Sequence, residues 1–218
     1  MTRERLHTTK TGRLESFSDG VFAIAITLLI LEVKVPELSK EASNARLLSA
    51  LVALWPSYLA LVTSFLSILI MWINHHSILD AVARCDRQFM SLNGLLLLLV
   101  SAVPFPTAVV AQYLTAPAEG IAVAVYAGMF FVINIVFVLL WRSATRPHIV
   151  KEDVTLERIA LVSRRLFVGL PGYLLAAFVS LLNPYVGIGI CLALWGVYWA
   201  FMAYEAPEER RGLRLFQK

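Results

Sequence analysis

Six long apolar runs, separated by short polar segments, dominate the hydrophobic pattern of this 218-residue chain. Each run is long enough to cross the hydrocarbon core of a bilayer as a helix, with some tilt in the longest. Because no water reaches that core, backbone N–H and C=O groups must pair within each segment, which requires helices here. The pattern predicts an all-α membrane protein, a six-transmembrane-helix bundle forming one domain over residues 1–218. The predicted spans cover residues 14–35, 47–73, 89–113, 121–141, 166–182 and 185–204.

Prolines in the third and fifth runs predict bent helices. Pro104 and Pro106 lie in the third run, and Pro171 lies in the fifth. A proline removes a helical hydrogen bond and clashes with the preceding turn, so both helices should kink. Such kinks serve packing more often than function, because neighbouring helices satisfy the freed carbonyls.

The composition agrees with a membrane protein. Hydrophobic residues make up 59% of the chain and charged residues only 16%, whereas soluble domains carry about 25% charged residues. The first run contains Asp19 and has no small-residue cleavage site after it, so we interpret it as a retained helix and not a signal peptide. The chain shows no basic, aromatic-interleaved surface of the kind that binds nucleic acid.

The basic residues gather on one side of the predicted bundle. All but three of the 19 Lys and Arg residues lie before the first run, in the second and fourth connections, or after the sixth run. The other three lie on the opposite side: Lys34 at the end of the first run, and Lys40 and Arg46 in the first connection. The positive-inside rule therefore predicts cytoplasmic N- and C-termini. We expect a multi-pass protein of the cell inner (plasma) membrane.

Catalytic motifs are missing from the sequence. It contains no phosphate-binding glycine loop, no His-Glu-x-x-His pair and no nucleophile elbow. The adjacent His75 and His76 point about 100° apart on a helix, which suits a shared metal ion poorly. We therefore expect neither an enzyme nor a resident cofactor.

One carboxylate, Asp19, lies near the start of the first run. An ionisable residue inside a span is costly, and is by default a candidate for function. Its apolar neighbours Phe17, Val21 and Phe22 favour burial against other helices. The alternative is an ordinary carboxylate at the water interface, stabilised by the dipole of the helix N-terminus.

A second feature of the first run is a stripe at positions i, i+3, i+4 and i+7, formed by Ile24, Thr27, Leu28 and Leu31. Asp19 lies five residues before Ile24, about 140° around a helix, so it does not share this stripe. In an apolar helix the spacing alone leaves open whether such a stripe faces lipid, the protein core or a pore.

Polar side chains also close the second run, where Asn74 and His75 follow Trp72. They lie at the same predicted membrane level as Arg13, Ser18 and Asp19. Polar contacts between membrane helices contribute about 0.6–2 kcal/mol each. We predict that Arg13, Asp19, Asn74 and His75 satisfy one another and hold the first helix at a fixed angle.

These residues resemble a known pattern. Arg13, Phe17-Ser18-Asp19 and the following Ile24-x-x-Thr27-Leu28 resemble the first helix of the transmembrane protein 175 family of potassium channels. The Trp72-x-Asn74-His75 segment is also similar to that family. The animal members carry two six-helix repeats, so this chain, with one, resembles a bacterial member.

The resemblance implies a potassium-selective homotetramer with the first helix of each subunit lining a central pore. It implies a hydrophobic constriction at Ile24, and further pore positions at Thr27, Leu28 and Leu31. A ring of Thr27 hydroxyls could then bind K⁺ transiently. It also implies a network that supports the pore helix, made of Arg13, Phe17, Ser18, Asp19, Trp72, Asn74 and His75. The partners implied are further copies of the chain, the lipid bilayer and K⁺ ions.

Two other functions remain open at this point. A proton-conducting or proton-coupled transporter would use Asp19 and His75 as a relay. A membrane-embedded enzyme is disfavoured, because the sequence offers no catalytic constellation.

Overall fold

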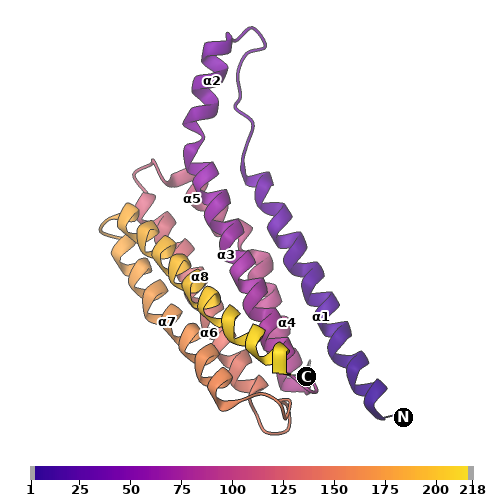
Figure 1. Ribbon diagram of the computed structural model, residues 1–218. Helices are drawn as coiled ribbons and strands as arrows, with labels where there is room; N and C mark the ends of the chain where they lie inside the picture. Colours follow the sequence, from indigo (N-terminus) through magenta and orange to yellow (C-terminus); the bar gives the residue numbers. More distant parts are fainter. Residues whose placement is uncertain (1–2, 216–218) are drawn as a thin grey trace.

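The computed structural model describes the backbone of residues 3–215 and the side chains of residues 11–201. This part of the chain is a bundle of helices, which confirms the predicted fold class (Figure 1). Within it, six helical segments are long and apolar enough to cross a membrane: Thr11–Glu32, Trp55–Asp80, Arg87–Tyr113, Glu119–Ala144, Leu156–Ser180 and Pro184–Phe201. The elements are α1 (Arg3–Leu28), the 3-10 helix η1 (Leu29–Glu32), α2 (Asn44–Ala53), α3 (Trp55–Asp80), α4 (Arg87–Ala102), α5 (Pro104–Tyr113), α6 (Glu119–Ala144), α7 (Leu156–Ser180) and α8 (Pro184–Leu215).

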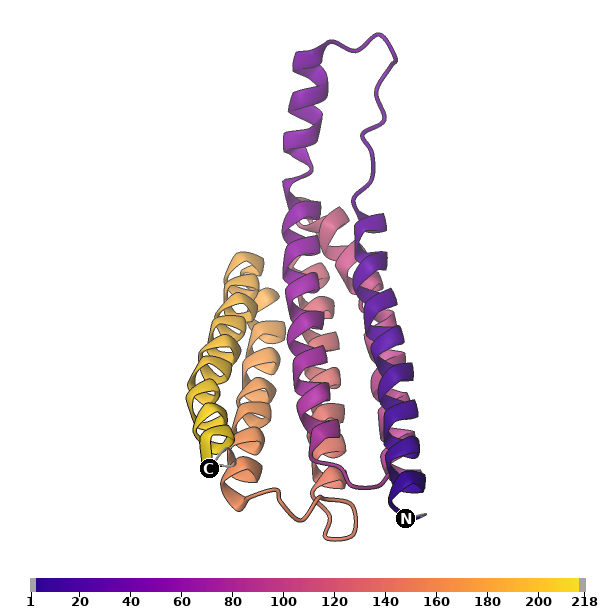
Figure 2. The ribbon, with the colours of Figure 1, turned by 45° about the vertical axis from the view of Figure 1, so that its right-hand side comes forward.

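The second span differs from the prediction of residues 47–73. The apolar run breaks at Leu54, and α3 begins at Trp55 with Pro56 in its first turn, where a missing N–H costs nothing. The preceding residues form α2, which extends beyond the rest of the bundle and has no buried residue (Figure 2). At the other end, α3 continues seven residues further, to Asp80.

The other spans agree more closely, with two exceptions. The third span is split between α4 and α5 at Val103, directly before Pro104, as the predicted kink requires. The fifth span begins at Leu156 and not at residue 166, because Thr155 caps α7 by accepting a hydrogen bond from the Arg158 N–H. Helix α7 is continuous through Pro171.

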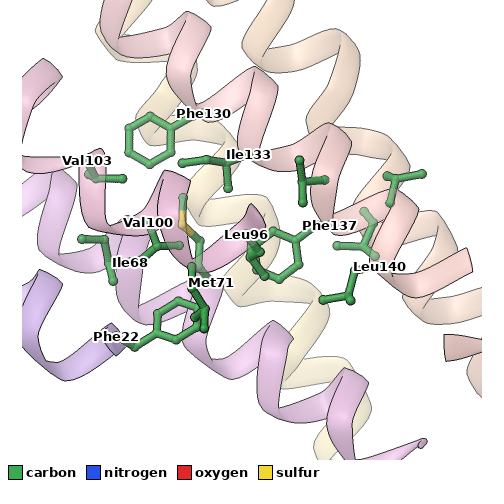
Figure 3. Close-up of a cluster of buried hydrophobic side chains, with 14 of the residues drawn as sticks. Phe22, Ile68, Met71, Leu96, Val100, Val103, Phe130, Ile133, Phe137 and Leu140 are labelled. Carbon is green, nitrogen blue, oxygen red and sulfur yellow. The ribbon is translucent and has the colours of Figure 1, made fainter. Parts of the chain in front are cut away.

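The core lies between α3, α4 and α6 (Figure 3). Ile68 and Met71 from α3 meet Leu96 from α4 and Phe137 from α6, with Phe22 of α1 at one edge. In the most apolar 18-residue stretch of α6, 56% of the residues are buried, compared with 22% in the corresponding stretch of the α1 span. Thus α6 is the central helix, and α1 packs along the outside of the subunit.

Two loops are joined at the end of the bundle where α1 begins and α8 ends (Figure 2). The Ala83 N–H donates to the Ile149 carbonyl at 2.8 Å, and the Lys151 N–H donates to the Ala81 carbonyl at 2.9 Å. Asp86 caps α4 by accepting a hydrogen bond from the Phe89 N–H, and its carboxylate forms a 2.9 Å ion pair with Arg146. These contacts fix the α3–α4 connection against the α6–α7 connection.

Candidate functional site

Helix α1, which lies on the outside of the bundle, has two distinct faces. Ser18, Phe22, Ala25 and Leu29 follow one another at intervals of three or four residues and are all buried against the subunit. Because α1 packs along the outside, its opposite face is largely exposed among the residues whose side chains are described. The four residues of the predicted stripe lie there.

The exposed stripe combines apolar groups with one hydroxyl. Ile24 is 60% exposed, Leu28 41% and Leu31 59%, and Thr27 is exposed between them. The Thr27 hydroxyl donates to the Ile24 carbonyl at 2.9 Å, which uses its hydrogen within the helix. Its oxygen therefore presents free lone pairs outward, as a ligand for a cation requires.

The carboxylate of Asp19 is turned toward α3. The indole Nε1 of Trp72 donates to Asp19 Oδ1 at 2.8 Å, across a partly buried contact. A hydrogen bond to a charged acceptor contributes about 1.5–3 kcal/mol. This bond joins the first turns of the α1 span to α3, and directs the carboxylate away from the exposed stripe.

A fully buried chain of hydrogen bonds lies next to this contact. His75 Nε2 lies 2.7 Å from Asn93 Oδ1, and Asn93 Nδ2 donates to Ser18 Oγ at 3.1 Å. Since an amide oxygen only accepts, the proton in the first bond belongs to His75 Nε2. Ser18 Oγ in turn donates to the Leu14 carbonyl at 2.8 Å. The chain thus connects α3, α4 and α1.

Asn93 was not among the predicted residues, although the sequence contained a signal for it. It is an amide near the start of an otherwise apolar run, where an unpaired polar group would be costly. Finding its partners required the spatial neighbourhood of α1 and α3. It is 1% exposed and bonds to two predicted residues, Ser18 and His75.

Three predicted support residues lie away from this network. Arg13 is exposed and makes no hydrogen bond or ion pair with the part of the chain whose side chains are described. Phe17 is 64% exposed, on the same side of α1 as Ile24. Asn74 is buried, but it faces α6 rather than α1. Since adjacent residues point about 100° apart on a helix, Asn74 and His75 cannot both face α1.

A charged cluster lies further toward the N-terminal end of α1. His76 Nδ1 lies 3.3 Å from Glu15 Oε1, and its Nε2 lies 3.9 Å from Asp80 Oδ2. Its ring also stacks on Trp72, with 6.0 Å between ring centroids. His76 therefore supports the residue that holds Asp19.

Comparison with known proteins identifies the family. Residues 13–104 match the family model described as the endosomal/lysosomal potassium channel TMEM175. A potassium channel from Chamaesiphon minutus is 47% identical over 192 residues, which cover 88% of this chain and 94% of the relative. The chain belongs to the TMEM175 family. The matched segment of this TMEM175 chain contains every residue of the stripe and of its support.

Two further comparisons extend the similarity over most of the TMEM175 chain. A potassium channel from Streptomyces collinus is 47% identical over 203 residues, covering 91% of this chain and 95% of the relative. The crystal structure of a lysosomal potassium-selective channel TMEM175 homolog from Chamaesiphon minutus superposes with a TM-score of 0.79 at 46% identity. It covers 88% of this chain and 97% of the solved one.

Proposed function

We propose that this multi-pass membrane protein is a potassium-selective channel, formed by four copies of the chain around a central pore that α1 lines. The observation that carries the proposal is the two-faced α1. One face is anchored to α3 and α4 by Trp72–Asp19 and by His75–Asn93–Ser18. The other presents Ile24, Thr27, Leu28 and Leu31, which are all exposed among the residues whose side chains are described. The relatives named as potassium channels support the choice of ion.

The stripe offers the two kinds of group that a cation pore needs. A ring of four Ile24 side chains forms a hydrophobic constriction, which gates conduction by dewetting. Thr27 lies about one turn further along α1, and four copies place four hydroxyl oxygens in one layer. A partly dehydrated K⁺ binds there transiently. The backbone-carbonyl filter of other potassium channels has no counterpart in this sequence.

The proposed orientation places both termini in the cytoplasm, in the inner (plasma) membrane. Arg84, Arg87, Arg142 and Lys151 are exposed at the end of the bundle where α1 begins (Figure 2). Excess basic charge at that end fits the positive-inside rule.

The pore assignment is tested by flux through purified protein in liposomes. Ile24→Asn wets the constriction and should raise K⁺ conductance. Ile30→Asn is the matched control, because Ile30 is 57% exposed in the same span, on the 3-10 helix η1 that continues α1, and lies on another side from Ile24. Equal effects of the two variants, or no effect of Ile24 and Thr27 substitutions on current and selectivity, would refute the assignment.

The tetramer has its own test. The mass of the protein in detergent should correspond to four chains of 24.3 kDa. A monomer would leave α1 without the facing copies that form the pore walls, and would contradict the proposal whatever the flux.

Proton conduction is a second candidate function. The buried chain from His75 through Asn93 to Ser18 favours it, because hydrogen-bonded side chains can relay protons. However, Asp19 bonds to Trp72, and the chain from His75 ends on the Leu14 carbonyl, which cannot release a proton. Acidification of liposomes under a proton gradient, abolished by His75→Gln while K⁺ flux stays low, would favour this candidate over the potassium channel.

A further inference from the structure

A small cavity with several polar groups in a mainly apolar lining lies on the side of α3 that faces away from α1, between α3, α6, α7 and α8. Its volume is about 20 Å³, and its polar lining residues are Ser67, Asn74, Asn134, Tyr173 and Tyr198. Both asparagines are more than nine-tenths buried, with exposed fractions of 5% and 6%. The cavity has no part in the proposed pore, which lies on the opposite side of α1.

Two carbonyl oxygens in this cavity need hydrogen-bond donors. Asn74 Oδ1 and Asn134 Oδ1 are buried and accept no hydrogen bond from the residues whose side chains are described. Asn134 Nδ2 donates to the Tyr198 hydroxyl at 3.2 Å, which fixes the orientation of the amide and leaves its oxygen as the open group. A buried acceptor without a donor destabilises the folded protein, because its hydrogen bond to water in the unfolded chain is not replaced. Two such acceptors beside one cavity point to an occupant that supplies donors to both.

The size and charge of the site select among possible occupants. A cavity of about 20 Å³ accommodates one water molecule, which needs roughly 10–15 Å³ by this measure. A cation of similar size would also satisfy two carbonyls. However, none of the residues that line the cavity is acidic, and most of them are apolar. Burying a cation without a paired charge is costly in such a site.

We propose that the cavity binds one structural water, which donates its two hydrogens to Asn74 Oδ1 and Asn134 Oδ1. Its oxygen accepts from the Tyr198 hydroxyl, because that group takes a hydrogen bond from Asn134 without using its own hydrogen. The water joins α3 to α6, and through Asn134 and Tyr198 to α8.

The location gives this water a mechanical role. Asn74 is the neighbour of His75 on the same turn of α3, and His75 supports α1 from the other side through Asn93. The same turn of α3 is thus fixed on one face by the network under α1 and on the other by the water. Gly169 of α7 makes room for the site, because an added Cβ would lie 2.6 Å from Asn134 Nδ2.

The direct test is a crystal structure of the full-length protein, at a resolution that resolves water, from crystals grown in rubidium chloride. We expect a density peak about 2.7–3.2 Å from both Oδ1 atoms, without an anomalous rubidium signal. An anomalous peak at this position would show that the cavity binds a monovalent cation, and would refute the proposed water. A cavity without density would refute the proposal.

Variants provide an independent test in the same crystals and in solution. Asn74→Leu should remove the peak, whereas Ser67→Ala should retain it, because the Ser67 hydroxyl donates to the Thr63 carbonyl at 2.7 Å. Asn74→Leu and Asn134→Leu should each lower Tm by roughly 2–8 °C. The Tm of the double variant should fall by less than the sum of the two single shifts, because the first substitution already leaves the second acceptor without its water. Fully additive shifts would show that the two amides share no water.

Discussion

Asn93→Leu tests the support of α1 most directly, because Asn93 bonds both neighbours at once. Leucine has nearly the same size but neither donates nor accepts. It removes the 2.7 Å bond from His75 and the 3.1 Å bond to Ser18. His75 is 0% exposed, so its Nε2–H then has no water to replace the lost acceptor.

The expected loss follows from these contacts. An orphaned buried donor costs about 1–3 kcal/mol. Ser18 loses less, since its hydroxyl keeps the Leu14 carbonyl as acceptor. Polar contacts between membrane helices average about 0.6 kcal/mol and reach about 1.7, which pulls the total down. We expect about 2 kcal/mol, which corresponds to about 4–8 °C in Tm for a chain of this size.

The assay is thermal unfolding in detergent, with the oligomeric mass recorded before heating. Gly94→Ala is the matched control on the next residue of α4, because a Cβ there meets nothing within 4 Å. A second comparison uses His75→Leu, which removes the orphaned donor, so that adding Asn93→Leu to it should cost little. If Asn93→Leu melts within about 1 °C of the unmodified protein, or adds fully to His75→Leu, the network does not hold α1.

Three further substitutions probe other contacts by thermal unfolding. Trp72→Phe removes the donor to Asp19 and should cost about 1–3 kcal/mol; equal stability with the exposed Trp55→Phe control would contradict this bond. Gly169→Ala brings a Cβ against Tyr198 and Asn134 and should cost about 1–3 kcal/mol, unlike Gly128→Ala, where a Cβ meets nothing within 4 Å. The Phe89 N–H, and then Arg146, hold the pKa of Asp86 below its ordinary 3.8. The ionised carboxylate therefore stabilises the fold above that value, and this stabilisation is lost as the pH falls through the lowered pKa of the folded state. Asp86→Asn should therefore flatten the fall in Tm between about pH 5 and pH 3, and an unchanged pH profile would exclude this linkage.

The sequence predicted much of the fold because a bilayer allows few solutions. A long apolar run has no alternative to a helix in lipid, so the number of spans and the all-α class followed from hydropathy. The break between α4 and α5 followed from Pro104, whose covalent structure acts locally. The separation of Asp19 from Ile24 around α1 followed from helical geometry alone.

Hydropathy was a poorer guide where apolar residues lie outside the bundle, or polar ones within it. Leu47 and Val52 are as apolar as residues of a span, yet they belong to α2, which projects beyond the other helices (Figure 2). Conversely, Arg165 is charged and falls just outside the predicted fifth span, residues 166–182, yet it is 1% exposed inside α7. Burial depends on which helices surround a residue, and a local average of hydropathy contains no such information.

Residue spacing along one helix was enough to predict that α1 has a polar anchor at its start and an apolar-and-hydroxyl stripe further along. The partners that hold this anchor became known only from the packing of the helices. It assigned Trp72 to Asp19 and Asn93 to both Ser18 and His75. It left Arg13 and Phe17 outside the network, and turned Asn74 toward α6. Hydrogen bonds between helices are set by how the helices rotate and pack against one another, and α3 and α4 contribute to that choice as much as α1.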